Sequence, residues 1–179
     1  MLFYDFSIAV LHYADKAFIR LGIIVNIILL THTREVLRAN NTGQLVSKVL
    51  GERARVVEWH RKQPDAALLS LIAAGKVGLV FPSDEAVIET TVSSASAEYL
   101  VLIDATWQEA RKMFNQSPYL KTLPRVALQA SQASIYPLRR NQIEGGLCTA
   151  ECVALLLKNA GEPVLAKQLT DQLMAFIED

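Results

Sequence analysis

Apolar residues gather in short runs that alternate with segments of helical periodicity. Several runs are apolar along their whole length, which is typical of strands buried on both faces of a sheet. The runs predict strands at residues 23–31, 54–59, 76–83, 97–104 and 124–129. The intervening segments predict helices at residues 40–50 (a turn feeding a helix), 64–75, 107–115, 149–161 and 163–179. This alternation predicts an α/β fold with a mostly parallel sheet and helices on both faces.

Helix boundaries are marked by capping residues and helix breakers. Pro64 is expected in the first turn of its helix, and glycine follows the helix at residue 75. Thr106 and Glu109 have the spacing of a capping box, and Thr149 is expected to cap the helix that begins there.

The apolar segments near the start predict neither a signal peptide nor a membrane span. MLFYDFSIAVL lacks a basic n-region, and Asp5 interrupts it. LGIIVNIILL covers ten residues, too few to cross a bilayer, and is better explained as a buried strand. With 179 residues, 51% of them hydrophobic, we expect a single soluble domain, without a membrane partner and located in the cytoplasm.

Several classes of chemistry have little support. Cys148 and Cys152, four residues apart on one predicted helix face, are expected to be reduced core residues, and they cannot make a four-ligand zinc site alone. His12, His32 and His60 form no metal-binding spacing. The chain contains no P-loop, no G-x-G-x-x-G fingerprint and no G-x-S-x-G elbow. We predict no metal site.

Charge is segregated along the chain although the formal net charge is zero. Residues 34–62 hold seven basic and three acidic side chains, and residues 104–140 hold six basic and two acidic ones. Both segments are therefore +4, and the rest of the chain is −8. Such segregation suits either a phosphate backbone or ordinary solvated helix faces.

Three polar stretches fall where predicted strands end: NNTG, FPSD and DATW. Ligands of parallel α/β sheets bind beyond the carboxyl ends of the strands. Asp104 lies two residues before the helix cap, so capping does not explain it, and it is a candidate base or substrate anchor. Trp107 is either a core residue or a stacking surface for a planar ring. The NTG amides are candidates for holding an anion.

Six stretches in order resemble the DTW-domain family over roughly residues 28–160. They are NNTGQL, LVFPS, LIDATWQEARKM, SPYLKTLPRV, YPLRR and EGGLCTAE, and the namesake D-x-T-W is Asp104, Thr106 and Trp107. The resemblance implies a tRNA-uridine aminocarboxypropyltransferase. Such an enzyme transfers the 3-amino-3-carboxypropyl group of S-adenosylmethionine (SAM) to N3 of a uridine in tRNA and releases 5′-methylthioadenosine. It also implies a SPOUT-like fold and allows for a C-terminal knot.

The resemblance assigns roles to residues at the matching positions. Its catalytic residues are Asp104, Thr106 and Trp107. Residues expected to bind SAM are Asn41, Thr42, Gly43, Pro82, Ser83, Leu102, Tyr136, Leu138, Arg139, Leu147, Thr149 and Glu151. Residues expected to bind RNA are Arg38, Arg111, Lys112, Arg125 and Arg140.

The chain departs from many family members because it has no cysteine before Cys148, where they carry a cysteine cluster. Residues 1–22 are interpreted as a divergent extension of a single DTW-type domain that spans residues 1–179. Two alternatives stay open: a SPOUT-like, SAM-dependent RNA methyltransferase, and a non-catalytic RNA-binding protein. The oligomeric state is not predicted.

Overall fold

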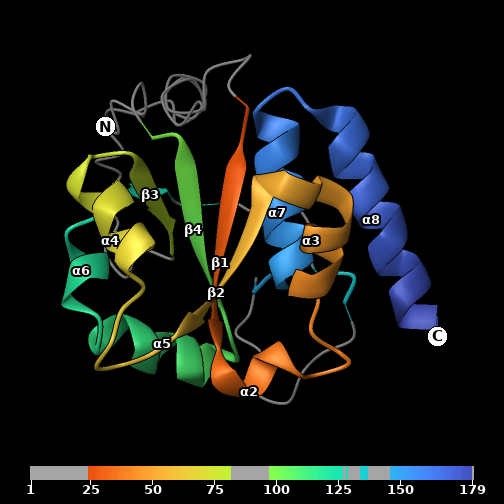
Figure 1. The fold of residues 1–179 in the computed structure, drawn as a ribbon. Helices are drawn as coiled ribbons and strands as arrows, with labels where there is room; N and C mark the ends of the chain where they lie inside the picture. The colour runs from red at the N-terminus through yellow and green to blue at the C-terminus, as the bar shows by residue number, and fades with distance from the viewer. Residues whose placement is uncertain (1–23, 82–96, 127, 129–133, 137–145, 179) are drawn as a thin grey trace, which may run out of the picture.

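A five-stranded parallel sheet forms the centre of the molecule (Figure 1). A computed structural model describes residues 24–81, 97–126, 128, 134–136 and 146–178. The strand order is β2-β1-β4-β3-β5, and every recorded pairing is parallel. The strands are β1 (Asn26–His32), β2 (Ala54–Trp59), β3 (Val77–Val80), β4 (Tyr99–Asp104) and β5 (Arg125–Val126). The predicted parallel α/β sheet is confirmed.

Helices cover both faces of the sheet, as expected. Figure 1 places α3, α7 and α8 on one face and α4, α5 and α6 on the other. The helices are α2 (Thr33–Val36), α3 (Gly43–Leu50), α4 (Ala66–Ala73), α5 (Trp107–Asn115), α6 (Pro118–Lys121), α7 (Thr149–Asn159) and α8 (Pro163–Glu178), with a 3-10 turn at Gly51–Arg53. The sequence pattern did not predict the short α2, α6 and 3-10 turn.

Alternate residues of β1 belong to two separate hydrophobic cores. Ile27 and Leu29 pack toward α3, α7 and α8, whereas Ile28 and Leu30 pack toward α4, α5 and α6. All four side chains are almost completely buried. Burial on both faces explains why the sequence of β1 is a continuous apolar run instead of an alternating pattern.

Two helix boundaries differ from the prediction. Pro64 lies before α4, and Asp65 is the N-cap, its carboxylate accepting a hydrogen bond from Leu68 N at 2.7 Å. α7 begins at Thr149, but its N-cap is Cys148. The expected glycine signals hold: Gly75 and Gly161 follow α4 and α7 with φ of 69° and 83°, a region that favours glycine.

The chain leaves β1 and β4 toward opposite faces of the sheet. After β1 it enters α3 on one face, and after β4 it enters α5 on the other. β1 and β4 are neighbours, and their register pairs Thr31 with Asp104 at the carboxyl ends. Diverging connections at adjacent parallel strands define the topological switch point at which α/β proteins bind ligands.

Parts of the expected fold lie outside the described residues. Residues 129–133 and 137–145 lie outside the described residues, and the SPOUT-like fold with a C-terminal knot stays a prediction. The N-terminal extension, residues 1–22, is likewise outside them. Among the helices of the described ranges, none is long and apolar enough to cross a membrane.

A part-buried ion pair ties the turn between α7 and α8 to the amino end of the sheet. Arg53 donates to both carboxylate oxygens of Glu162 at 2.7 Å and to the carbonyl of Val25 at 2.7 Å. Glu162 also accepts from the amide of Val25 at 3.4 Å. The hydrogen bonds from Arg53 hold the pKa of the Glu162 carboxyl below its ordinary value of 4.5.

Glu162→Gln should lower the free energy of unfolding at pH 7 by about 1–2 kcal/mol, because a charge-assisted pair becomes a neutral contact. Since the folded-state pKa is lowered, the wild-type advantage is complete above pH 4.5 and is lost as the pH falls through the lower folded-state value. Urea unfolding between pH 7 and pH 3.5 measures it. The control Asp171→Asn, which breaks an exposed pair with Lys167, should cost less than about 0.5 kcal/mol. Equal effects of both changes would contradict the prediction.

Candidate active site

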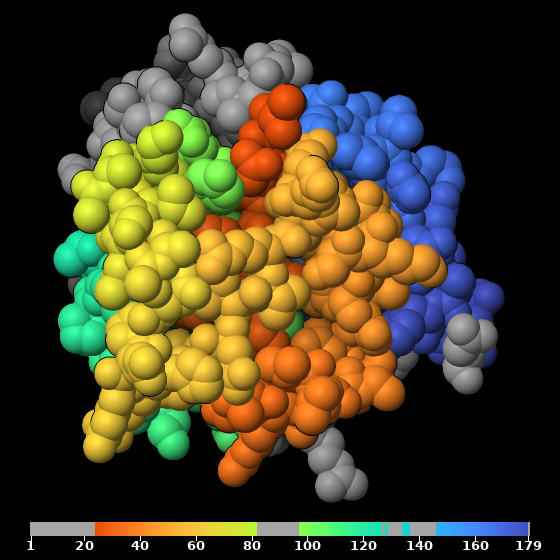
Figure 2. Space-filling view, viewed as in Figure 1, coloured from red at the N-terminus to blue at the C-terminus, as the bar shows by residue number. Residues whose placement is uncertain are grey.

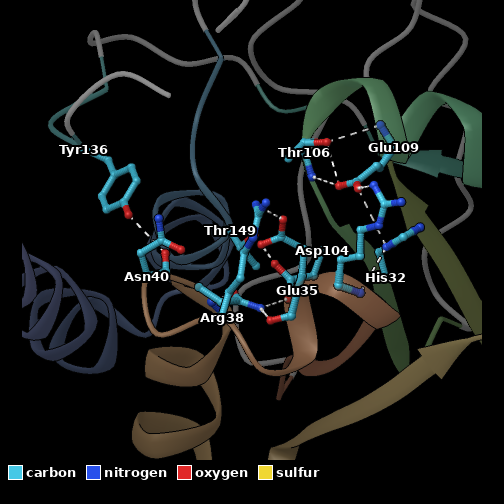
Figure 3. Close-up of polar contacts among 12 residues, drawn as sticks. His32, Glu35, Arg38, Asn40, Asp104, Thr106, Glu109, Tyr136 and Thr149 are labelled. Atoms are coloured by element: carbon cyan, nitrogen blue, oxygen red, sulfur yellow. Dashed lines mark hydrogen bonds and ion pairs between the residues drawn. The ribbon is translucent and has the colours of Figure 1, made fainter. Parts of the chain in front are cut away.

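The carboxylate of Asp104 joins three other segments at the carboxyl end of β4 (Figure 3). It is 3% exposed and accepts hydrogen bonds from Asn41 Nδ2 at 2.8 Å and Thr149 Oγ1 at 2.7 Å. Thr31 Oγ1 lies 3.3 Å from Asp104 Oδ2 and equally far from the carbonyl of Leu29, so it shares its proton between them. A buried carboxylate needs such donors, and here all of them are neutral.

Gly43 packs directly against this carboxylate at the first position of α3. A Cβ atom at residue 43 would lie 2.7 Å from Asp104 Oδ2 and 3.0 Å from Asn41 Oδ1. The Gly43 amide donates to Asn41 Oδ1 at 2.6 Å. The expectation that the amides of this turn are open to an anion is therefore wrong for Gly43, because its amide proton is already bonded.

Glu151 fastens the segment 134–136 to the start of α7. Its carboxylate accepts hydrogen bonds from Ser134 Oγ, Ile135 N and Cys148 N, each at 2.7 Å. The expectation that Thr149 caps α7 is wrong, since Cys148 occupies the N-cap and Glu151 binds its amide. The Thr149 hydroxyl is thereby left to bind Asp104.

Two further contacts bring the predicted SAM-binding residues together. The amide of Ala150 donates to Thr42 Oγ1 at 3.4 Å and so joins α7 to the start of α3. Tyr136 donates its hydroxyl to the carbonyl of Asn40 at 3.1 Å (Figure 3). Segments around residues 40–43, 104, 134–136 and 148–151, far apart in the sequence, therefore meet at the switch point.

Thr106 and Glu109 form the predicted capping box of α5. Thr106 Oγ1 lies 2.7 Å from Glu109 Oε2 and accepts from the Glu109 amide at 3.4 Å, while the Thr106 amide donates to Oε2 at 3.2 Å. Burial alone would raise the pKa of the Glu109 carboxyl, but the Thr106 hydrogen bonds and the nearby His32 and Arg38 lower it overall. Its other oxygen lies 3.8 Å from both His32 Nδ1 and Arg34 Nη1.

Trp107 stands at the end of an aromatic column beside the strand ends. Its ring stacks on Phe81 with centroids 6.0 Å apart, and Phe81 stacks on Phe114 at 4.6 Å. The guanidinium of Arg125 lies 4.9 Å from the centroid of the Phe114 ring. Phe81 and Phe114 are buried, whereas Trp107 is partly exposed, so the column fixes the plane of a ring that still reaches solvent.

The predicted RNA-binding side chains fall at several places. Arg111 and Lys112 are exposed on α5, which starts at the candidate site. Arg38 is paired with Glu35 at 2.5 Å, and Arg125 stacks on Phe114. The RNA-binding roles of these residues stay predictions.

Not every predicted SAM-binding residue reaches the cluster. Leu102 is 4% exposed within the core formed with α3, α7 and α8, so its side chain serves the core. Leu147 is partly buried just before α7. Pro82, Ser83, Leu138 and Arg139, and the predicted RNA-binding residue Arg140, lie outside the described residues.

Sequence reasoning missed three residues of the site: Thr31, His32 and Glu35. Thr31 is 1% exposed beside Asp104, and Glu35 is 1% exposed where its backbone carbonyl accepts from Asn41 Nδ2 at 2.9 Å. His32 stacks on Trp59 with centroids 5.9 Å apart. The available signal was a polar Thr-His pair ending the apolar run of β1, the same pattern that singled out Asp104 after β4.

Cys148 and Cys152 are free thiols, as predicted. Burial raises the pKa of each thiol to about 12, so both are protonated at neutral pH. A thiol that stays protonated is a poor nucleophile. Within the described ranges, no three His, Cys, Asp or Glu side chains are grouped to hold a metal ion.

The fold and the cluster around Asp104 define an α/β protein with a candidate ligand site at its topological switch point. A model of the DTW domain matches residues 20–179, and the chain belongs to that family. A curated relative, "tRNA-uridine aminocarboxypropyltransferase 2" of Drosophila melanogaster, is 32% identical over 139 residues, which are 73% of this chain and 55% of the relative. The chain thus spans about half the length of that relative. No solved structure matches the chain.

Gly43→Ala should destabilise the protein by about 1–3 kcal/mol, because the new methyl group would overlap Asp104 Oδ2. The sign is diagnostic, since alanine is intrinsically better in a helix than glycine by about 1 kcal/mol. Urea unfolding measures the change. The control Ser47→Ala, on the same helix, removes a buried hydroxyl that has no partner among the described residues and should be neutral or stabilising. A stabilised Gly43→Ala protein would contradict the close packing.

Proposed function

We propose that this protein transfers the 3-amino-3-carboxypropyl group of SAM to N3 of a uridine in tRNA and releases 5′-methylthioadenosine. The proposal is supported by membership of the DTW family and by the name of the Drosophila relative. The structural observation that carries it is the buried Asp104, which lies with Asn41, Gly43 and Thr149 at the topological switch point.

The residues of the site suit a cationic donor that also bears polar groups. The sulfonium and α-ammonium groups of SAM are positive, and Asp104 supplies a buried carboxylate whose donors among the described residues are neutral. Gly43, which has no side chain, leaves room for this carboxylate against the start of α3. Tyr136, from the segment 134–136, and Thr149 and Glu151, from the start of α7, lie on the same side of the site. We expect Arg139 to bind the methionine carboxylate.

SAM supplies an electrophilic γ-carbon beside a sulfonium leaving group. Uridine N3 would form a bond to that carbon, the carbon–sulfur bond would break, and its electron pair would stay on sulfur as the thioether of methylthioadenosine. The protein then has two tasks, to hold the reactants in line and to accept the N3 proton.

We assign Asp104 Oδ1 as the atom that accepts the proton from uridine N3. Its partner oxygen, Oδ2, already faces Asn41 and Thr31, whereas among the described residues Oδ1 accepts only from Thr149. In this proposal, the second lone pair of Oδ1 accepts a hydrogen bond from the imide of a uracil. Trp107, fixed by the aromatic column, offers a ring face on which uracil or adenine can stack.

The reaction is tested by incubating the purified protein with SAM and bulk tRNA, followed by mass spectrometry of the nucleosides and small products. We expect a uridine carrying the aminocarboxypropyl mass together with methylthioadenosine in equal amount. Methylated nucleoside with S-adenosylhomocysteine would assign the protein instead to the RNA methyltransferases. Tight tRNA binding without either product would assign it a binding role.

Asp104→Asn should lower the rate of tRNA modification by about 100-fold or more, because the amide cannot accept the N3 proton. SAM binding and the unfolding midpoint, measured alongside, separate lost chemistry from a damaged site. Asp65→Asn is the matched control: it makes the same change at the N-cap of α4 and should leave the rate unchanged. If Asp104→Asn modifies tRNA at the wild-type rate, the carboxylate is not the base of the reaction.

A further inference from the structure

The segment after β1 forms an exposed tip between two buried anchors. Residues 36–40 are all exposed, whereas Glu35 on one side and Asn41 on the other are 1% and 6% exposed. Leu37 is 92% exposed, and its neighbour Val36 is 44% exposed. Leu37 is more exposed than any other large hydrophobic side chain of the described ranges, so the tip presents apolar surface to solvent.

Hydrogen bonds hold this tip in one conformation. The amide of Arg38 donates to Glu35 O at 3.2 Å, and the amide of Asn41 donates to Arg38 O at 3.0 Å. Asn41 Nδ2 donates to Glu35 O at 2.9 Å and, at 2.8 Å, to Asp104 Oδ2. The tip is therefore ordered before any partner binds and is attached to the candidate catalytic carboxylate through one side chain.

The charge that the tip presents to solvent is positive. The Arg34 and Arg38 side chains flank Leu37 in sequence and are 77% and 47% exposed. Their acidic neighbours lie deeper, since the side chains of Glu109 and Glu35 are 17% and 1% exposed. Outward guanidinium groups around an apolar side chain suit RNA, which offers phosphates and the faces of unstacked bases, better than they suit an apolar protein surface.

Resting on the function proposed above, we infer that residues 33–40 are the docking element for the tRNA substrate. Leu37 inserts against an unstacked base or ribose next to the target uridine, and Arg34 binds a phosphate. α2, which leads into the tip, follows the carboxyl end of β1 and lies near α5 (Figure 1), with Arg34 3.8 Å from Glu109. RNA held by this element is therefore placed near the ends of β1 and β4. Arg34, Val36 and Leu37 thereby join Arg38 as recognition residues.

The inference is tested with Leu37→Ser and Arg34→Gln in the full chain. Leu37→Ser should weaken tRNA binding about tenfold, since an apolar contact is lost. Leu37→Met, which keeps an apolar side chain, should bind tRNA like wild type. Arg34→Gln should weaken binding and reduce the slope of log affinity against log salt by about one. SAM affinity and the melting temperature should be unchanged in all three variants. Filter binding of bulk tRNA at several salt concentrations measures the affinities.

Matched controls make the same changes away from the tip. Val164→Ser removes a 79% exposed apolar side chain from the start of α8, and Lys158→Gln removes one exposed charge near the end of α7. Neither should alter tRNA affinity.

The outcomes separate this inference from the proposed reaction. If wild-type protein modifies tRNA but Leu37→Ser and Arg34→Gln bind it like wild type, the docking element is wrong and the reaction stands. If Leu37→Ser changes only self-association in light scattering, the tip is a contact between copies and the inference is overturned. If wild-type protein neither binds nor modifies tRNA, both proposals fail together.

Discussion

The hydrogen bonds of one buried carboxylate determine how this molecule is put together. Asp104 ends a central strand inside the protein, where an unpaired charge would be strongly unfavourable. Among the described residues, its hydrogen-bond partners are neutral groups of Thr31, Asn41 and Thr149. Each donor comes from a different segment, so the two strands, the turn before α3 and the start of α7 can satisfy the carboxylate only when all are in place. Gly43 must remain small for the same reason.

Sheet topology explains why this convergence occurs at β1 and β4. The connections after β1 and β4 leave toward opposite faces of the sheet. They diverge at the carboxyl ends of these strands, which is where open α/β sheets have a crevice. The register places Thr31 directly beside Asp104. α7, which lies after β5 in the chain, returns to the same edge and brings Thr149 and Glu151 with it. A cluster of this kind depends on strand order more than on any local motif.

Local patterns were predictable and long-range pairings were not. Residues 54–59 and 107–115 form the predicted strand and helix, and the capping box of Thr106 and Glu109 follows from spacing alone. Strand order, however, depends on which apolar faces meet, and periodicity does not contain that information. The sequence therefore predicts Thr149 as a helix cap, whereas in the structure its hydroxyl donates to Asp104 Oδ1 at 2.7 Å. α2, with four residues, is too short to leave a periodic signal.

Asn41 unites the two halves of the proposed mechanism. Its side-chain amide donates at once to Asp104 and to the carbonyl of Glu35, from which the exposed tip departs, while its oxygen receives the Gly43 amide. Folding thus fixes the tip, the carboxylate and the start of α3 relative to one another. In the proposed reaction, the ordering cost of this loop would be met when the protein folds and not when RNA binds. More of the binding energy would then remain for placing uridine N3 against the donor carbon.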